Sequence, residues 1–228
     1  MQKSSPLAIG VLVSGSGSNL QAIMDRCADG TIPGRVCVVI SNKKDVFALE
    51  RARKAGIAAV VVDHQHHAGR EAFEKELAVV LQRHGVELIC LAGFMRILSP
   101  WFVRHFSGRI LNIHPALLPA FPGLNVQKKA LDAGVRFSGA TVHFVDDGVD
   151  TGPVVIQVVV PILPGDDAQK LSARILVQEH RIYPLAVRWY AQGRLRLAGR
   201  KVQLETMDGR VDDMITESEK AWIHPIAS

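Results

Sequence analysis

The chain has 228 residues, of which 48% are hydrophobic and 21% are charged, a profile typical of one globular domain with a sizeable core. No apolar run approaches the ~20 residues that a membrane helix needs, so we expect no membrane span. The net charge of +5 favours anionic ligands. Basic residues form only short pairs without interleaved aromatics, so we expect no nucleic-acid partner.

The first half of the chain alternates between strand and helix patterns. The predicted strands are residues 7–13, 36–40, 58–62, 86–91 and 109–113, and the predicted helices between them are residues 19–28, 45–55 and 69–84. Continuous apolar strands separated by helices of this length predict βαβ units and a mostly parallel sheet with helices on both faces. Ligands of such a sheet bind at the carboxyl ends of its strands.

The second half has a different pattern. A helix is predicted at 125–133, followed by two strands, 138–145 and 153–160, close enough in sequence to be antiparallel neighbours. A long helix follows from about residue 167, which Pro184 is expected to kink or split, and residues 194–204 predict a hairpin.

The predicted fold class is therefore α/β, a single Rossmann-like domain with a mostly parallel central sheet and antiparallel strands in its C-terminal half. We expect residues 1–6 to be a short N-terminal extension, 7–200 the domain, and 201–228 an extension packed on it or trailing from it.

Cysteine usage and the N-terminus bear on the compartment. Cys27, Cys37 and Cys90 are widely spaced and odd in number, which predicts reduced thiols and neither a disulfide framework nor a zinc site. The apolar stretch near the N-terminus is short for a signal peptide and leads directly into a glycine-rich loop. We therefore expect a cytoplasmic protein.

A glycine-rich loop, residues 14–19 (SGSGSN), lies between the first predicted strand and the first helix. Backbone N–H groups around Gly17, Ser18 and Asn19 would suit a phosphate at the start of a helix. The loop lacks the G-K-[ST] ending of nucleotide triphosphate sites, and Leu20 replaces the third glycine of the dinucleotide fingerprint. An NADP site is one alternative, because Lys43 and Lys44 could bind the extra phosphate on its ribose. The other alternative is a glycine-rich turn with a purely structural role.

Asn112 and His114 interrupt the apolar strand at 109–113. Positions two apart in a strand share a face, so these side chains would project together. A buried amide or imidazole needs partners, and a pattern broken twice on one face indicates a functional site. The alternative is a strand that simply ends there, with both residues in an ordinary turn.

A carboxylate near His114 would favour the imidazolium form of its ring and make it a proton donor. Three candidates, Asp146, Asp147 and Asp150, follow the strand at 138–145, and the residues alone do not choose among them. His143 alternates within that strand, which predicts a packed histidine. The histidines at 64, 66 and 67 are better explained by a solvated loop than by a metal site.

Taken together, these motifs resemble the folate-dependent formyltransferases, and within that family the phosphoribosylglycinamide formyltransferases of purine synthesis. The similarity runs from about residue 7 to residue 195 through VLVSGSGSNLQAI, SNKKDVFALERARKAGI, LAGFMRILSP, NIHPALLPAFPGLN, ATVHFVDDGVDTGPV and QEHRIYPLAVRW. The residues after about 200 do not match clearly.

The resemblance implies specific roles. Asn112, His114 and Asp150 match the catalytic residues, and Gly17, Ser18, Asn19 and Glu179 match those that bind glycinamide ribonucleotide. The 10-formyltetrahydrofolate site is matched by Arg70, Met95, Arg96, Ile97, Leu98 and Asn112. Without the resemblance, Arg70 and Glu179 would be taken for solvated helix residues and 95–98 for apolar packing. The implied co-substrate is 10-formyltetrahydrofolate, with no metal, in a monomer or weak homodimer.

Three other functions remain open. Formyltetrahydrofolate deformylase shares the chemistry but carries an added N-terminal domain for which we expect no room. Methionyl-tRNA formyltransferase would need a larger C-terminal domain than the residues after 200 provide. A non-enzymatic NADP- or phosphate-binding module would need only the glycine-rich loop, and it leaves Asn112, His114 and Asp150 unexplained.

Overall fold

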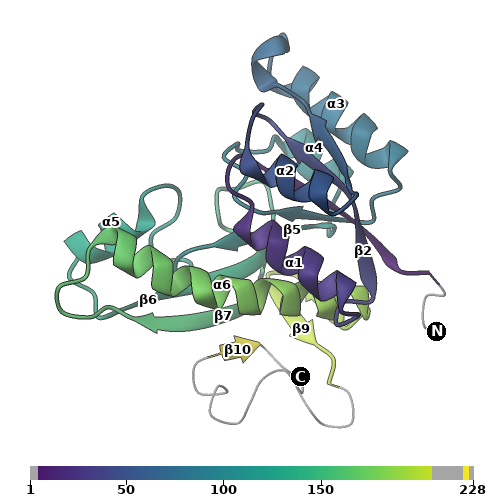
Figure 1. Ribbon diagram of the computed structural model, residues 1–228. Helices are drawn as coiled ribbons and strands as arrows, with labels where there is room; N and C mark the ends of the chain where they lie inside the picture. Colours follow the sequence, from purple (N-terminus) through teal and green to yellow (C-terminus); the bar gives the residue numbers. More distant parts are fainter. Residues whose placement is uncertain (1–4, 207–222, 226–228) are drawn as a thin grey trace. The chain divides into compact units, whose positions relative to one another are not determined.

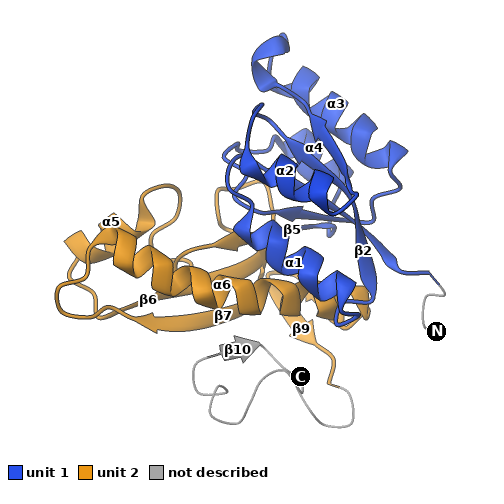
Figure 2. Ribbon diagram, viewed as in Figure 1, with its two compact units in different colours: residues 1–112 blue, residues 113–228 orange. Residues whose placement is uncertain are grey.

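The computed structural model describes residues 5–206 and the backbone of residues 223–225 (Figure 1). The chain forms two compact units, residues 1–112 and residues 113–228 (Figure 2). The division falls within one strand, β5 (Ile110–His114), whose last two residues belong to the second unit.

The first unit is built on parallel strands. In the order β5-β4-β1-β2-β3 these are the first residues of β5, then β4 (Leu88–Leu91), β1 (Leu7–Val13), β2 (Gly34–Ser41) and β3 (Ala58–Val61). Every residue of β1 is buried, as its continuous apolar sequence predicts for a central parallel strand. The parallel arrangement predicted from the first half of the sequence is therefore confirmed.

Four α-helices and a 3₁₀ turn connect these strands: α1 (Ser18–Ala28), α2 (Phe47–Lys54), η1 (His64–His66), α3 (Arg70–Arg83) and α4 (Pro100–His105). Helix α1 packs on β2, α2 packs on β2 and β3, and α3 packs against α4. Helix α4 was not predicted from the sequence. Its signal is the pair Ser99-Pro100, because the Ser99 side chain accepts the Phe102 N–H and proline suits the first turn of a helix.

The second unit contains an antiparallel pair, β6 (Phe137–Phe144) and β7 (Val154–Pro161), as predicted. Helix α5 (Val126–Asp132) precedes the pair, and the long helix α6 (Ala168–Ala191) lies along both strands (Figure 1). Pro184 was expected to kink or split α6; a split is contradicted, because the helix continues through Pro184 to Ala191. Buried packing of residues 182–187 offsets the hydrogen bond that proline cannot donate.

The predicted hairpin after α6 is confirmed as β8 (Leu195–Ala198) and β9 (Lys201–Leu204). A further strand, β10 (Ile223–Pro225), pairs antiparallel with β7 and was not predicted. The remainder of the expected extension at 201–228, residues 207–222 and 226–228, lies outside the described residues.

Candidate active site

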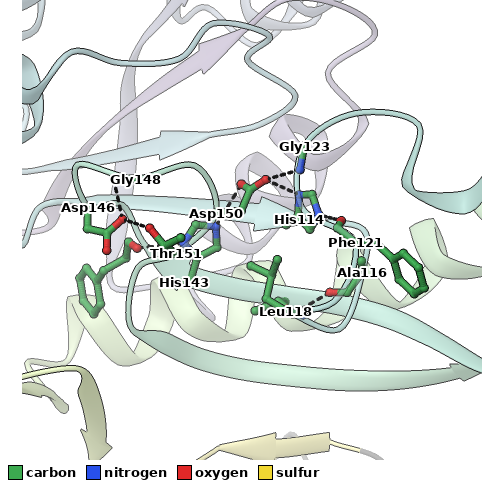
Figure 3. Close-up of polar contacts among 12 residues, drawn as sticks. His114, Ala116, Leu118, Phe121, Gly123, His143, Asp146, Gly148, Asp150 and Thr151 are labelled. Carbon is green, nitrogen blue, oxygen red and sulfur yellow. Dashed lines mark hydrogen bonds and ion pairs between the residues drawn. The ribbon is translucent and has the colours of Figure 1, made fainter. Parts of the chain in front are cut away.

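His114 ends strand β5 in the second unit and is only 5% exposed. Its ring is bounded by two acceptors (Figure 3). Nε2 lies 2.9 Å from the carbonyl oxygen of Phe121, and Nδ1 lies 3.3 Å from Oδ2 of Asp150. Because a carbonyl can only accept, Nε2 carries a hydrogen, and a proton on Nδ1 completes the contact with the carboxylate.

Asp150 is the carboxylate that the structure pairs with His114. Its Oδ2 also accepts the Gly123 N–H at 2.8 Å, so one oxygen joins the imidazole to the loop after β5. Asp146, in contrast, serves the turn itself, accepting from the Gly148 N–H and from Thr151 Oγ1 (Figure 3). The structure thus makes the choice that the residues alone left open.

Backbone packing fixes the place of Asp150. The residue has a φ of 54°, in the left-handed region that favours glycine, asparagine and aspartate. Gly152 lies two residues after Asp150 and packs closely against the end of β6. A Cβ atom at this position would lie 1.8 Å from the Phe144 carbonyl oxygen, so only glycine fits there. The Pro153 carbonyl then accepts the Phe144 N–H at 2.9 Å, which closes the loop between β6 and β7.

His143 is a buried neighbour of Asp150. It was predicted to be packed, and it is 2% exposed. Its Nε2 also lies 3.8 Å from Oδ1 of Asp150, while Nδ1 lies 2.9 Å from the Phe144 carbonyl oxygen. Burial lowers the pKa of His143, and the Phe144 carbonyl and Asp150 oppose this only partly. Asp150 therefore lies between the imidazoles of His114 and His143. Burial disfavours the charged form of His143.

The glycine-rich loop of the first unit has the geometry expected of an anion site. Gly17 precedes α1 with a φ of 71°, and a Cβ atom there would lie 2.6 Å from the Cβ of Ala48. Glycine is thus required both by the backbone and by the close approach of α2. Arg51 of α2 donates to the Ser16 carbonyl oxygen at 3.0 Å and holds the loop. Ser18 and Asn19 are the first two residues of α1, and the start of a helix favours anions.

Residues 95–98 show apolar side chains on a fixed backbone. Met95 is 61% exposed and Ile97 is 62% exposed, so the alternative of plain apolar packing holds only for the buried Leu98. The Met95 N–H donates to Ser14 Oγ at 2.9 Å, and that hydroxyl donates to Asn42 Oδ1 at 2.5 Å. Exposed apolar groups on a constrained segment suit the flat ring of a folate.

Arg70 begins helix α3, and its Nε lies 3.4 Å from Oε1 of Glu74 one turn later. Within residues 5–206 the terminal nitrogens of Arg70 make no hydrogen bond, so its forked edge can receive a carboxylate. Arg70 and residues 95–98 both lie in the first unit. Arg96 is exposed within the same segment.

The remaining predicted site residues are divided between the units. Asn112 lies in the first unit, two positions before His114 along β5. Glu179 lies on α6 in the second unit and is buried, so the alternative of a solvated helix face is wrong for this residue. The predicted catalytic pair His114 and Asp150 is brought together directly.

Two further observations concern metal binding and membrane helices. Among the residues that the structure describes, no three histidine, cysteine or carboxylate groups gather where they could hold a metal ion. Across residues 5–206, none of the helices combines the length and the apolar character that crossing a membrane requires.

The chain belongs to the formyl transferase family, whose model matches residues 7–187 and so extends over both units. It is 50% identical over 187 residues to the phosphoribosylglycinamide formyltransferase of Escherichia coli, covering 82% of this chain and 88% of that protein. It is also 53% identical over 190 residues to the trifunctional purine biosynthetic protein adenosine-3 of Drosophila pseudoobscura pseudoobscura, where the match covers 82% of this chain and 14% of the relative.

Solved structures give the same result. The glycinamide ribonucleotide transformylase 1 of Symbiobacterium toebii superposes with a TM-score of 0.87 at 53% identity, covering 89% of this chain and 95% of that one. A formyltetrahydrofolate deformylase from Pseudomonas syringae superposes with a TM-score of 0.81 at 23% identity, covering 87% of this chain and 66% of that one, which shows a shared fold alone. The predicted family and the α/β fold class are therefore confirmed.

Proposed function

We propose that this chain transfers the formyl group of 10-formyltetrahydrofolate to the amine of glycinamide ribonucleotide. The observation that carries the proposal is the contact between His114 and Asp150, in a chain half identical to a phosphoribosylglycinamide formyltransferase. An imidazole held between a carboxylate and a carbonyl suits the stabilisation of the negative charge that develops on the oxygen of a formyl group under attack.

His114 has the central role in this reaction. The substrate amine attacks the formyl carbon, and the carbonyl oxygen gains negative charge as a tetrahedral species forms. The Nε2–H of His114, which the Phe121 carbonyl accepts in this structure, is the donor that we assign to that oxygen. The developing oxyanion would then replace a neutral backbone carbonyl as the partner of a charged donor, which strengthens the hydrogen bond as the reaction proceeds.

Asn112 and Asp150 support this step in different ways. The Asn112 amide supplies a second donor from the same strand, two positions before His114. Asp150 contacts Nδ1 and orients the ring, and its negative charge stabilises positive charge on the imidazole during the reaction. We assign to Asp150 and an ordered water the relay of the amine proton to the departing folate nitrogen, whose bond to the formyl carbon breaks as the tetrahedral species collapses.

Substrate binding is assigned to the other predicted residues. Gly17, Ser18 and Asn19 bind the phosphate of the ribonucleotide through backbone N–H groups at the start of α1. Glu179 accepts from its ribose hydroxyls. Arg70, Arg96 and the apolar groups of the 95–98 segment, with Asn112, bind the formyl donor.

The test is to incubate the chain with a 10-formylfolate and follow folate absorbance with and without glycinamide ribonucleotide. Deformylation that requires the ribonucleotide supports the transferase. Deformylation without it assigns the chain to the hydrolases, and none in either case favours a binding module. His114→Ala should fold normally and lose several orders of magnitude in turnover; retention of most activity would refute its role. A cytoplasmic location and a monomeric or weakly dimeric state remain predictions from the sequence.

A further inference from the structure

Glu74 is a buried carboxylate in the middle of helix α3 and is only 1% exposed. Its Oε1 accepts the Ser99 N–H at 2.7 Å, and its Oε2 accepts the Ser99 hydroxyl. A buried charge is tolerated only when it is paired and hydrogen bonded. These contacts from Ser99 therefore fix the carboxylate in place at the start of α4.

The same carboxylate faces Arg70, because residues four apart on a helix are neighbours. Oε1 lies 3.4 Å from Nε of Arg70, whose side chain is partly exposed whereas that of Glu74 is buried. Nε is therefore the part of the guanidinium that contacts Glu74, and within residues 5–206 its terminal nitrogens make no hydrogen bond. Anchoring one edge removes rotamers of a long, flexible side chain before any ligand arrives, which lowers the entropic cost of binding.

Glu74 also connects Arg70 with residues 95–98, because Ser99 follows that segment directly. One end of the segment is fixed by Ser14, which accepts the Met95 N–H, and the other end is fixed by Glu74 through Ser99. One buried carboxylate therefore contacts Arg70 and the residue that directly follows the 95–98 segment. A helix cap alone requires no arginine partner, since Ser99 already accepts the Phe102 N–H at 3.3 Å.

We propose that Glu74 is a positioning residue for the formyl donor: its buried carboxylate, fixed by Ser99, orients the Arg70 guanidinium so that the terminal nitrogens receive a carboxylate of the donor. This rests on the proposed function, since it requires that Arg70 contacts the folate. Glu74 acts on ligand binding through Arg70 and takes no part in the chemical step.

The test is a double-mutant cycle of Glu74→Gln and Arg70→Ala. Glutamine keeps the shape and one acceptor oxygen for Ser99 but removes the charge that holds Arg70. The matched control is Glu76→Gln, an exposed glutamate on the same helix that pairs with His67. Initial rates are measured for all variants with a 10-formylfolate and glycinamide ribonucleotide, after circular dichroism confirms that each is folded.

Arg70→Ala should raise the KM for the donor ~10- to 100-fold, as expected for loss of a charge-assisted contact. Glu74→Gln should raise the same KM ~3- to 10-fold through loss of orientation, while kcat and the KM for the ribonucleotide change less than ~2-fold. The double variant should match Arg70→Ala alone, because coupled residues are not additive. Glu76→Gln should behave as wild type.

A purely structural role of Glu74 predicts a different result. Loss of its hydrogen bonds to Ser99 would then change the KM for the donor by the same factor in the wild-type chain and in the Arg70→Ala variant. The inference is overturned if the effects of Glu74→Gln and Arg70→Ala add, or if Glu74→Gln leaves the donor KM unchanged. The inference is also overturned if Arg70→Ala has no effect on the KM for the donor. In that case, formyl transfer by the Arg70→Ala variant would still support the proposed function. Absence of transfer by the wild-type chain would instead reject the proposed function.

Discussion

Replacing Asp150 with asparagine tests whether the charge at this position drives the reaction. Asparagine tolerates the left-handed φ of 54° and keeps an oxygen for the Gly123 N–H, so the fold should be preserved. Two unit charges 3.3 Å apart, as for His114 Nδ1 and Asp150 Oδ2, attract by ~5 kcal/mol at an effective dielectric constant of ~20. Desolvation offsets much of this attraction, and the net value of a charge-assisted hydrogen bond is ~1.5–3 kcal/mol.

That free energy corresponds to a loss of ~10- to 150-fold in kcat, since each ~1.4 kcal/mol changes a rate tenfold. The assay is the initial rate of folate deformylation at saturating concentrations of both substrates, with thermal unfolding as the check on folding. Asp146→Asn is the matched control, because Asp146 serves only the same loop through Gly148 and Thr151. Equal effects of the two substitutions on kcat would refute the reasoning, as would unchanged turnover in Asp150→Asn.

Two further predictions concern the glycine-rich loop and a pH-dependent ion pair. Gly17→Ala should destabilise the chain by ~1–3 kcal/mol and raise the KM for glycinamide ribonucleotide, because its Cβ would lie 2.6 Å from that of Ala48. Gly30→Ala, at a φ of 78° with open space around it, should cost only the backbone strain, and denaturant unfolding of both compares them. Arg174 lowers the pKa of Asp166 from 3.8 to about 2, so this pair should stabilise the fold above pH ~4 and lose its contribution as the pH falls toward 2. In Arg174→Gln the NMR titration of Asp166 should move back toward 3.8; an unchanged midpoint would contradict the assignment.

The fold was largely predictable because its signals are local. Strand β1 was predicted with its observed bounds, Leu7–Val13, since a continuous apolar run between turn signals has few alternatives. Helix α4 was missed because its six residues are too few to show a helical period. The split at Pro184 was wrong because buried packing over a long helix outweighs one lost hydrogen bond, and that packing comes from distant residues.

The site was only partly predictable, for the same physical reason. The break in pattern at Asn112 and His114 is local and was recognised. The choice of Asp150 over its neighbours came from the family resemblance, since it depends on a loop bringing residue 150 back to residue 114. Glu74 shows the limit most clearly: it lies on the buried face of α3 with Leu77 and Leu81, but its hydrogen-bond partner Ser99 is 25 residues away in the sequence.

The buried polar groups of this chain also hold its loops, which affects how substitutions should be interpreted. His114 donates to the Phe121 carbonyl, Asp150 accepts the Gly123 N–H, and the bonds join residues 7 and 27 positions apart. The loop at 121–123 is thus anchored by the same two side chains to which we assign the chemistry. Changing either one alters both a charge and a loop position, and only the change of charge should act on kcat without changing the KM for either substrate. A substitution that raises both KM values and lowers kcat therefore reports displacement of the loop, and Asp150→Asn is the cleaner probe because it retains the oxygen that holds Gly123.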